Sequence, residues 1–201
     1  MRMTSIYFVR HAEPNHIWED DRTRPLSDEG LEDIKKVADF FRDCEIDYYI
    51  SSPYKRSIDT IRQIASYHGL SIQIDERLRE RKSGLDGNNV GMFQKRWKDF
   101  NFCEEGGETL NMVQTRNIEA IFEVLNNYRD RNIVIATHGT ALSTILNYFT
   151  PPYECNDFLR IIDFMPYIIR LDFNGVNLVG KEELLIVKKE FKGRKNDISI
   201  L

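Results

Sequence analysis

Short apolar runs alternate along this chain with longer segments whose apolar residues recur at the spacing of a helix. Runs rich in β-branched and aromatic residues predict strands at residues 5–10, 48–51, 71–75, 132–137, 167–173 and 183–187. The recurrence at helical spacing predicts helices over residues 27–41, 52–69, 92–100, 108–128 and 138–149. This alternation predicts an α/β fold: a three-layer α/β/α sandwich with a mostly parallel central sheet, made by residues 1–201 as a single domain.

Local signals mark where two of these helices begin and one ends. Ser27 is expected to cap the first helix, and Ser52 to cap the second, with Pro53 in its first turn. Gly69 is expected to end the second helix. Residues 79–107 carry five glycines and are predicted to be largely irregular, which is typical of functional loops.

Charged and imidazole side chains directly follow three of the predicted strands. Arg10 and His11 end the first strand, and Arg56 lies in the helix after the second. His138 and Gly139 follow the fourth strand. Ligands of open α/β sheets bind outside the carboxyl ends of the strands, where helix N-termini offer N–H groups to an anion. The sequence therefore predicts one anion site built from two arginines and two histidines.

Composition narrows the class of protein. Hydrophobic residues make up 41% of the 201 residues and charged residues 30%, the mean hydropathy is −0.47 and the formal charge is −4. These values are typical of a globular protein and lack the basic excess of nonspecific nucleic-acid binders. No run approaches the ~20 apolar residues that span a bilayer. Neither a nucleic acid nor a membrane is expected as a partner.

The cysteines indicate the compartment. Cys44, Cys103 and Cys155 are widely spaced and odd in number, and no zinc-ligand spacing is present. A disulfide framework is not expected, and we predict a reduced, cytoplasmic protein that holds no metal.

Six short motifs occur in one order along the first three quarters of the chain. They read R-H-A-E at residues 10–13, P-L-S-x-x-G at 25–30, S-S-P-x-x-R at 51–56, L-R-E-x-x-x-G at 78–84, G-G-E-T at 106–109 and T-H-G at 137–139. In these motifs the chain resembles the histidine phosphatase superfamily, also called the phosphoglycerate mutase-like family. Each motif is weak alone, and the order and spacing of all six make the resemblance specific.

The resemblance implies a role for each residue of the predicted anion site. His11 would be the nucleophile and become a phosphohistidine. Arg10, Arg56 and His138 would bind the phosphoryl oxygens. Glu80 would protonate the leaving oxygen and then activate water, and no metal or cofactor is implied.

General chemistry agrees with this division of roles. Phosphoryl transfer spreads negative charge over the equatorial oxygens, which fixed cations stabilise. Arginine binds phosphate in a bidentate way, and neighbouring arginines favour the neutral imidazole that can attack. An alkoxide is a poor leaving group, so a carboxylic acid across the site has a clear use.

Other polar residues near these motifs allow two readings. Gly139 is expected to add a phosphate contact, and Glu108 would either bind substrate or stand at the N-terminus of its helix. Glu13 is expected to be a structural partner and His16 to lie on the surface. Basic and aromatic residues alternate at 92–100, which could stack on nucleic acid, but an amphipathic helix over the site is the simpler reading.

We predict a phosphomonoesterase that hydrolyses a small phosphorylated metabolite, because mutases of this family tend to be longer. A cofactor-dependent phosphoglycerate mutase and a non-catalytic phospholigand-binding module are the alternatives. The chain departs from the family pattern at Pro14, Ser57 and Asp59 and in residues 85–88. The sequence predicts neither the substrate nor the oligomeric state, and the basic residues at 188–195 are expected to be a solvated end.

Overall fold

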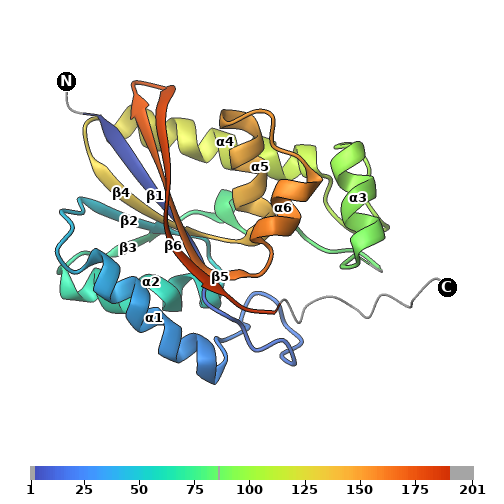
Figure 1. Cartoon of the computed structure of the whole chain (residues 1–201), viewed down its shortest axis with the longest axis horizontal. Helices are drawn as coiled ribbons and strands as arrows, with labels where there is room; N and C mark the ends of the chain where they lie inside the picture. Colours follow the sequence, from blue (N-terminus) through green and yellow to red (C-terminus); the bar gives the residue numbers. More distant parts are fainter. Residues whose placement is uncertain (1–2, 86, 191–201) are drawn as a thin grey trace.

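A six-stranded mixed sheet forms the centre of the computed structural model, which describes residues 3–85 and 87–190 (Figure 1). The strands are β1 (Thr4–Arg10), β2 (Tyr48–Ser51), β3 (Ile72–Ile74), β4 (Asn132–Thr137), β5 (Phe164–Asn174) and β6 (Asn177–Lys188). They lie in the order β3-β2-β4-β1-β5-β6. The first four strands in this order run parallel, and β5 and β6 continue the sheet as an antiparallel hairpin. The predicted three-layer, mostly parallel architecture is confirmed.

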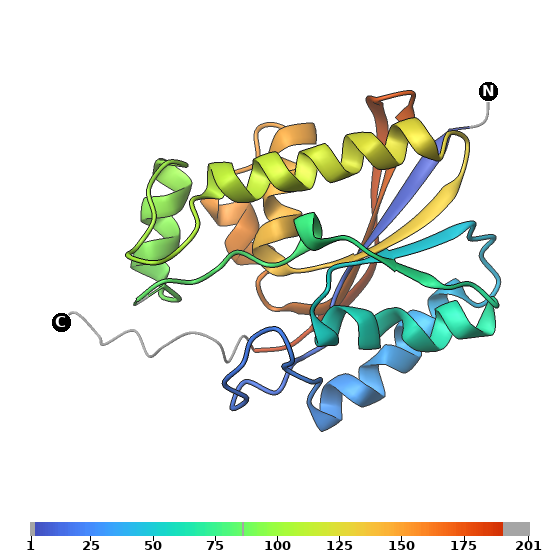
Figure 2. The ribbon, with the colours of Figure 1, turned by 180° about the vertical axis from the view of Figure 1, so that it is seen from behind.

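Helices cover both faces of the sheet (Figures 1 and 2). One face carries α1 (Asp28–Phe41) and α2 (Lys55–Tyr67), and the other carries α4 (Leu110–Asn127), α5 (Gly139–Phe149) and α6 (Cys155–Ile161). The helix α3 (Val90–Lys98) lies beyond α6, and a short 3₁₀ helix, η1 (Glu76–Leu78), follows β3. Each layer has its own apolar core, because alternate side chains of one strand point to opposite faces.

The helix boundaries test the local sequence signals. Ser27 caps α1 by accepting a hydrogen bond from the Gly30 N–H, and Gly69 follows α2 with a φ of 69°. Both predictions are confirmed. The predicted start of α2 is wrong, because the helix begins at Lys55 with no side-chain cap. The Ser52 hydroxyl instead lies 2.7 Å from Nε2 of His138, so the candidate cap belongs to the site.

The region from 79 to 107 is irregular on both sides of α3. Asn89 caps α3 by accepting from the Met92 N–H, and the Phe93 side chain is buried against the core. The amphipathic helix expected at 92–100 is therefore present, two residues earlier. Neither α6 nor η1 was expected from the sequence. Of the basic residues expected as a solvated end at 188–195, Lys188 ends β6 and Lys189 pairs with Asp33 at 2.8 Å, and those beyond position 190 lie outside the described residues.

Two further expectations can be compared with the structure. Cys44, Cys103 and Cys155 are free thiols. Within the described ranges, every helix is too short or too polar to cross a bilayer.

Candidate active site

A cavity of about 560 Å³ opens at the carboxyl ends of β1, β2 and β4. Five of the seven predicted site residues line it: Arg10, His11, Arg56, Glu80 and Gly139. His138 lies behind His11, with 5.2 Å between the ring centroids, and Glu108 lies outside the lining. The sheet thus brings together residues as distant in sequence as Arg10 and Gly139, as the strand-end argument predicts.

His11 is fixed in one tautomer by its two ring contacts. Its Nδ1 lies 2.7 Å from the carbonyl oxygen of Ala12, which can only accept, so Nδ1 carries the proton. Its Nε2 accepts from Nε–H of Arg56 at 3.2 Å, since a guanidinium can only donate. Both contacts require the same tautomer, in which Nε2 is unprotonated and its lone pair faces Nε–H of Arg56.

Burial and positive charge keep both histidines neutral. Burial lowers the pKa of His11 well below its usual value, and the charges of Arg56 and Arg10 lower it further. Burial likewise lowers the pKa of His138 well below its usual value, with Arg56 as the next cause. A neutral imidazole is the form that can act as a nucleophile.

These shifts predict that the protein loses stability in mild acid. Below pH ~6.5 the unfolded chain protonates both histidines while the folded chain does not, so stability falls as pH falls. We expect urea titrations at pH 7.5 and 5.5 to show a loss of about 2–3 kcal/mol, from up to ~1.4 kcal/mol per pH unit for each histidine. His11→Asn should remove about half of this loss. Equal stability at the two pH values would contradict neutral burial.

Arg10 is anchored away from its strand. Its Nη1 donates to the carbonyl oxygens of Ile161 and Ile162 at the end of α6, the latter at 2.9 Å. Burial lowers its pKa to about 10, which still leaves it charged at neutral pH. Its Nε is buried without a hydrogen-bond partner within the described ranges. A Cβ on Gly139 would lie 3.3 Å from the guanidinium carbon of Arg10, so glycine there lets the two approach closely.

His138 is held by two serine hydroxyls. Its Nε2 lies 2.7 Å from Oγ of Ser52 and 3.2 Å from Oγ of Ser57. Its Nδ1 is buried with no partner in the part of the chain that the structure describes. Ser57, noted in the sequence as a departure from the family pattern, therefore contacts an imidazole of the site.

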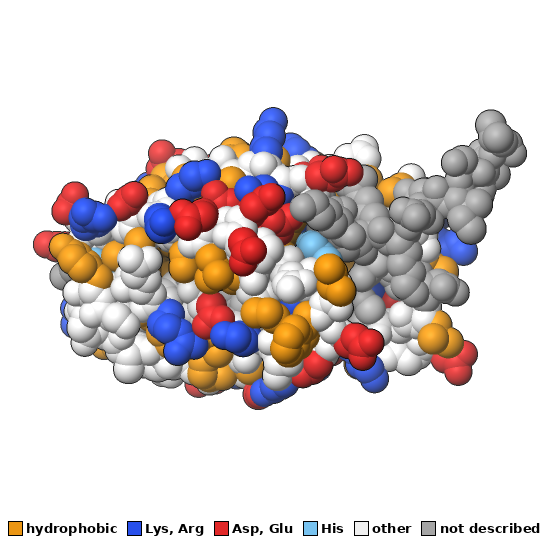
Figure 3. All heavy atoms as spheres, turned by 90° about the horizontal axis from the view of Figure 1, so that it is seen from below, with side chains coloured by type: hydrophobic (Ala, Val, Ile, Leu, Met, Phe, Trp, Pro, Cys, Tyr) orange, Lys and Arg blue, Asp and Glu red, His pale blue; other side chains and the backbone are white. Residues whose placement is uncertain are grey.

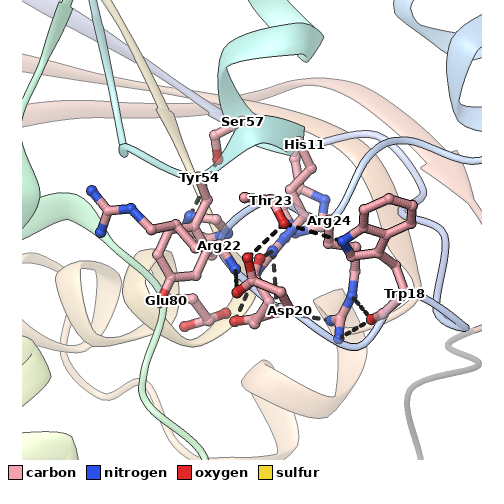
Figure 4. Close-up of polar contacts among 12 residues, drawn as sticks. His11, Trp18, Asp20, Arg22, Thr23, Arg24, Tyr54, Ser57 and Glu80 are labelled. Carbon is pink, nitrogen blue, oxygen red and sulfur yellow. Dashed lines mark hydrogen bonds and ion pairs between the residues drawn. The ribbon is translucent and has the colours of Figure 1, made fainter.

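Glu80 lies at the N-terminus of α5. Its carboxylate accepts from the backbone N–H groups of Thr140 at 3.0 Å, Ala141 at 3.1 Å and Arg81 at 2.7 Å. The positive end of the helix dipole stabilises a carboxylate in this place. Glu80 and His11 both line the cavity (Figure 4), so a molecule bound there would meet both side chains.

Glu108 supports the segment that carries Glu80 and does not face the cavity. Its carboxylate pairs with Arg79 at 2.6 Å and Arg116 at 3.0 Å and accepts from the backbone N–H of Lys82 at 2.9 Å. These contacts join Glu108 to the residues on both sides of Glu80. The reading of Glu108 as a substrate ligand is corrected, because its oxygens are already used by these three partners.

Glu104 is the centre of a second buried cluster, which the sequence did not predict. It pairs with Arg81 at 2.6 Å and Arg96 at 2.9 Å and accepts from the Gly84 N–H. Burial alone would raise the pKa of Glu104, but these hydrogen bonds and charges lower it to about 2. A Cβ on Gly87 would lie 2.5 Å from a Glu104 oxygen. The cluster ties the loop before α3 to the loop after it.

Breaking this cluster should cost much of the protein's stability. Glu104→Gln leaves two buried guanidiniums without their carboxylate, a change that typically costs about 3–5 kcal/mol. We expect a loss in that range in urea unfolding at pH 7, and a loss below about 1 kcal/mol for Glu105→Gln, whose residue is exposed. An unchanged midpoint in Glu104→Gln would mean that the two arginines do not depend on this carboxylate.

Some residues of the cavity were not predicted from the sequence. His16, expected on the surface, lines the cavity, as do Asp21, Arg24 and Lys82. The one available signal for His16 was its place five residues after His11. Glu13 is buried and its carboxylate accepts from the Ser27 hydroxyl at 2.9 Å, a contact of the structural kind expected.

Charge on the outside is mixed. Acidic, basic and hydrophobic side chains are interspersed on the described part of the face seen in Figure 3, without a large basic patch. Within residues 3–85 and 87–190, no three His, Cys, Asp or Glu side chains are grouped as metal ligands would be.

Comparison with known proteins gives a family and relatives. The model of the histidine phosphatase superfamily (branch 1) matches residues 6–173. A probable phosphoglycerate mutase, GpmB, from Enterobacter sp. (strain 638) is 28% identical over 161 residues, 72% of this chain and 74% of that protein. An uncharacterized phosphatase, PhoE, from Bacillus subtilis (strain 168) is 26% identical over 151 residues, 72% of this chain and 76% of that protein.

Solved structures share the fold. Mycobacterial glucosyl-3-phosphoglycerate phosphatase Rv2419c aligns with a TM-score of 0.72 and 18% identity, covering 94% of this chain and 100% of that chain. A phosphoserine phosphatase mutant from Entamoeba histolytica, in complex with phosphoserine, aligns with a TM-score of 0.72 and 19% identity, covering 88% of this chain and 94% of that chain. At 18% and 19% identity these alignments show that the fold is shared.

Proposed function

The chain belongs to branch 1 of the histidine phosphatase superfamily, and from this membership we propose that it hydrolyses phosphomonoesters through a phosphohistidine at His11. The observation that carries the proposal is the single tautomer of His11. Its Nδ1–H is bound to the Ala12 carbonyl, and its Nε2 lone pair lies beside Arg56 in the cavity. This is the arrangement that an attacking imidazole needs.

The first step forms the phosphoenzyme. The Nε2 lone pair attacks phosphorus, an N–P bond forms, and the bond from phosphorus to the ester oxygen breaks. Glu80 gives its proton to the departing oxygen. Arg10 and Arg56 bind the phosphoryl oxygens, whose charge is greatest during the transfer. The sequence-based role of His138 in binding these oxygens is not carried into the proposal, because the imidazole lies behind His11 and outside the cavity lining.

The second step restores the enzyme. Glu80, now a carboxylate, takes a proton from water as the water oxygen attacks phosphorus. The N–P bond breaks, inorganic phosphate leaves, and His11 returns to the neutral tautomer. In the free enzyme the carboxylate accepts hydrogen bonds from the N–H groups of Thr140 and Ala141.

We propose a small phosphorylated metabolite as substrate and a mechanism that needs no metal. The names of two structural neighbours, a glucosyl-3-phosphoglycerate phosphatase and a phosphoserine phosphatase, support this class of substrate. Several cationic side chains line the cavity, Arg10 and Arg56 among them, and they supply charge that could stabilise a transferring phosphoryl group. A cytoplasmic location stays a prediction.

The proposal is tested by assaying the native protein with p-nitrophenyl phosphate and a metabolite-phosphate panel in the presence of a chelator. Release of inorganic phosphate is expected. The mutase alternative rests on the GpmB relative and requires that 3-phosphoglycerate is isomerised faster than it is hydrolysed. Tight phosphate binding without turnover on any substrate would instead identify a non-catalytic module.

A further inference from the structure

The loop from 15 to 24, between β1 and α1, is held in shape by its own polar contacts (Figure 4). Asp20 accepts from the Arg22 N–H at 3.2 Å and from the Thr23 hydroxyl at 2.6 Å. Arg24 donates from Nε and Nη2 to the carbonyl oxygen of Trp18 at 3.1 and 3.0 Å. The loop is therefore an ordered wall of the cavity, and it presents Asp21.

Asp21 contacts the end of the Arg56 guanidinium. Nη1 of Arg56 lies 2.6 Å from the Asp21 carbonyl oxygen and 3.1 Å from Oδ1, and Nη2 lies 3.5 Å from Oδ2. The Arg56 side chain is 4% exposed and that of Asp21 is 43% exposed. Oδ1 also accepts from Nη1 of Arg24 at 2.8 Å. The carboxylate thus joins a buried arginine to the loop.

Arg56 uses a different edge toward the nucleophile. A guanidinium offers two pairs of donors, Nη1 with Nη2 at its end and Nε with Nη2 at its side. The Asp21 carboxylate faces the end pair, while Nε donates to Nε2 of His11 at 3.2 Å. The side pair therefore faces the place where a phosphoryl group would meet His11.

We propose that Asp21 is a positioning residue, which holds Arg56 so that its side pair of donors meets the phosphoryl group in the transition state. This inference rests on the proposed function. A guanidinium fixed by a charged partner keeps its direction without reorganising during the reaction, and such preorganised donors contribute most where charge develops. Asp21 acts through Arg56 and touches no reacting atom.

The test compares Asp21→Asn with Asp20→Asn, a neighbour with the same chemical change. Asp20→Asn removes a negative charge from the same loop, but it leaves the contacts between Asp21 and Arg56 in place. For p-nitrophenyl phosphate we expect kcat of Asp21→Asn to fall about tenfold with KM within about threefold, because the lost interaction acts in the transition state. Asp20→Asn should stay within about twofold of the native protein.

A comparison of two inhibitors distinguishes a positioning role from a merely structural one. Orthovanadate imitates the five-coordinate transition state, whereas inorganic phosphate imitates the product. Asp21→Asn should weaken vanadate inhibition about tenfold and phosphate inhibition less than threefold, and thermal unfolding should confirm that both variants are folded.

Three results would overturn the proposal. An unchanged kcat in Asp21→Asn would show that Arg56 needs no such partner. A lower KM and tighter phosphate binding would show that Asp21 competes with substrate. An equal loss in Asp20→Asn would show a role in loop folding alone. These three results are distinct from a failure of the proposed function. That failure would appear as hydrolysis by the His11→Ala variant at the rate of the native protein.

Discussion

Replacing His11 by asparagine should lower kcat for phosphomonoester hydrolysis by about 10⁴-fold or more, because an amide side chain has no ring nitrogen that can attack phosphorus. Asparagine can keep a donor near the Ala12 carbonyl, where Nδ1 of His11 donates at 2.7 Å, and it lacks the attacking nitrogen. Inorganic phosphate should therefore still bind, with its inhibition constant within about tenfold of native. The measurement is steady-state phosphate release together with alkali-stopped labelling from a radioactive phosphomonoester.

The control and the contrary outcome are well defined. His68, whose Nδ1 lies 2.9 Å from the Tyr49 hydroxyl, is outside the cavity lining, so His68→Asn should leave kcat unchanged. In the native protein the label should be stable in base and released by acid, as expected of a phosphoramidate. Label that persists in His11→Asn, or hydrolysis at a native rate, would move the nucleophile to another residue.

The sequence predicts the parts of the site that follow from strand ends. Arg10, His11 and His138 stand directly after apolar runs, and parallel strands carry their carboxyl ends to one edge. Their meeting could thus be predicted without knowing any side-chain contact. Glu80 could be predicted only through the family motif, because its own segment is irregular and charged.

The supporting contacts could not be predicted, because they join residues that are distant in sequence. Asp21 meets Arg56 across 35 positions, and Glu104 meets Arg81 across 23. The helix α6 has 7 residues, too few for a periodic pattern, yet its end supplies the carbonyl groups that hold Arg10. Ser52 looked like a helix cap because a serine before proline is a local signal, whereas its contact with His138 depends on β4.

The formal charge of the whole chain is −4, but the charge within the cavity has the opposite sign. Four arginines line one cavity together with the carboxylates of Asp21 and Glu80, namely Arg10, Arg24, Arg56 and Arg81. Buried charges act over short distances in a medium that screens them little, so this local excess governs anion binding there. An acidic protein can therefore select an anionic substrate.

Glu80→Gln should separate the two steps of the proposed reaction. Glutamine cannot give a proton to the leaving oxygen, so kcat/KM for an alkyl phosphate should fall about 10²–10⁴-fold, the usual contribution of general acid catalysis. For p-nitrophenyl phosphate, whose leaving group needs no proton, formation of the phosphoenzyme should be nearly native. Attack by water should be slow because the same residue is its base.

The expected signature with p-nitrophenyl phosphate is a burst of about one equivalent of p-nitrophenol, followed by a slow steady state and accumulation of phosphohistidine. Glu105→Gln, an exposed neighbour of Glu104, serves as the control. The Glu80→Gln protein should remain folded, losing about 1–3 kcal/mol because a glutamine amide cannot satisfy all three N–H groups that the carboxylate accepts. Equal losses for alkyl and nitrophenyl substrates, with no burst, would assign the proton transfers to another residue. His16 would then be the first to test, since its imidazole lines the same cavity.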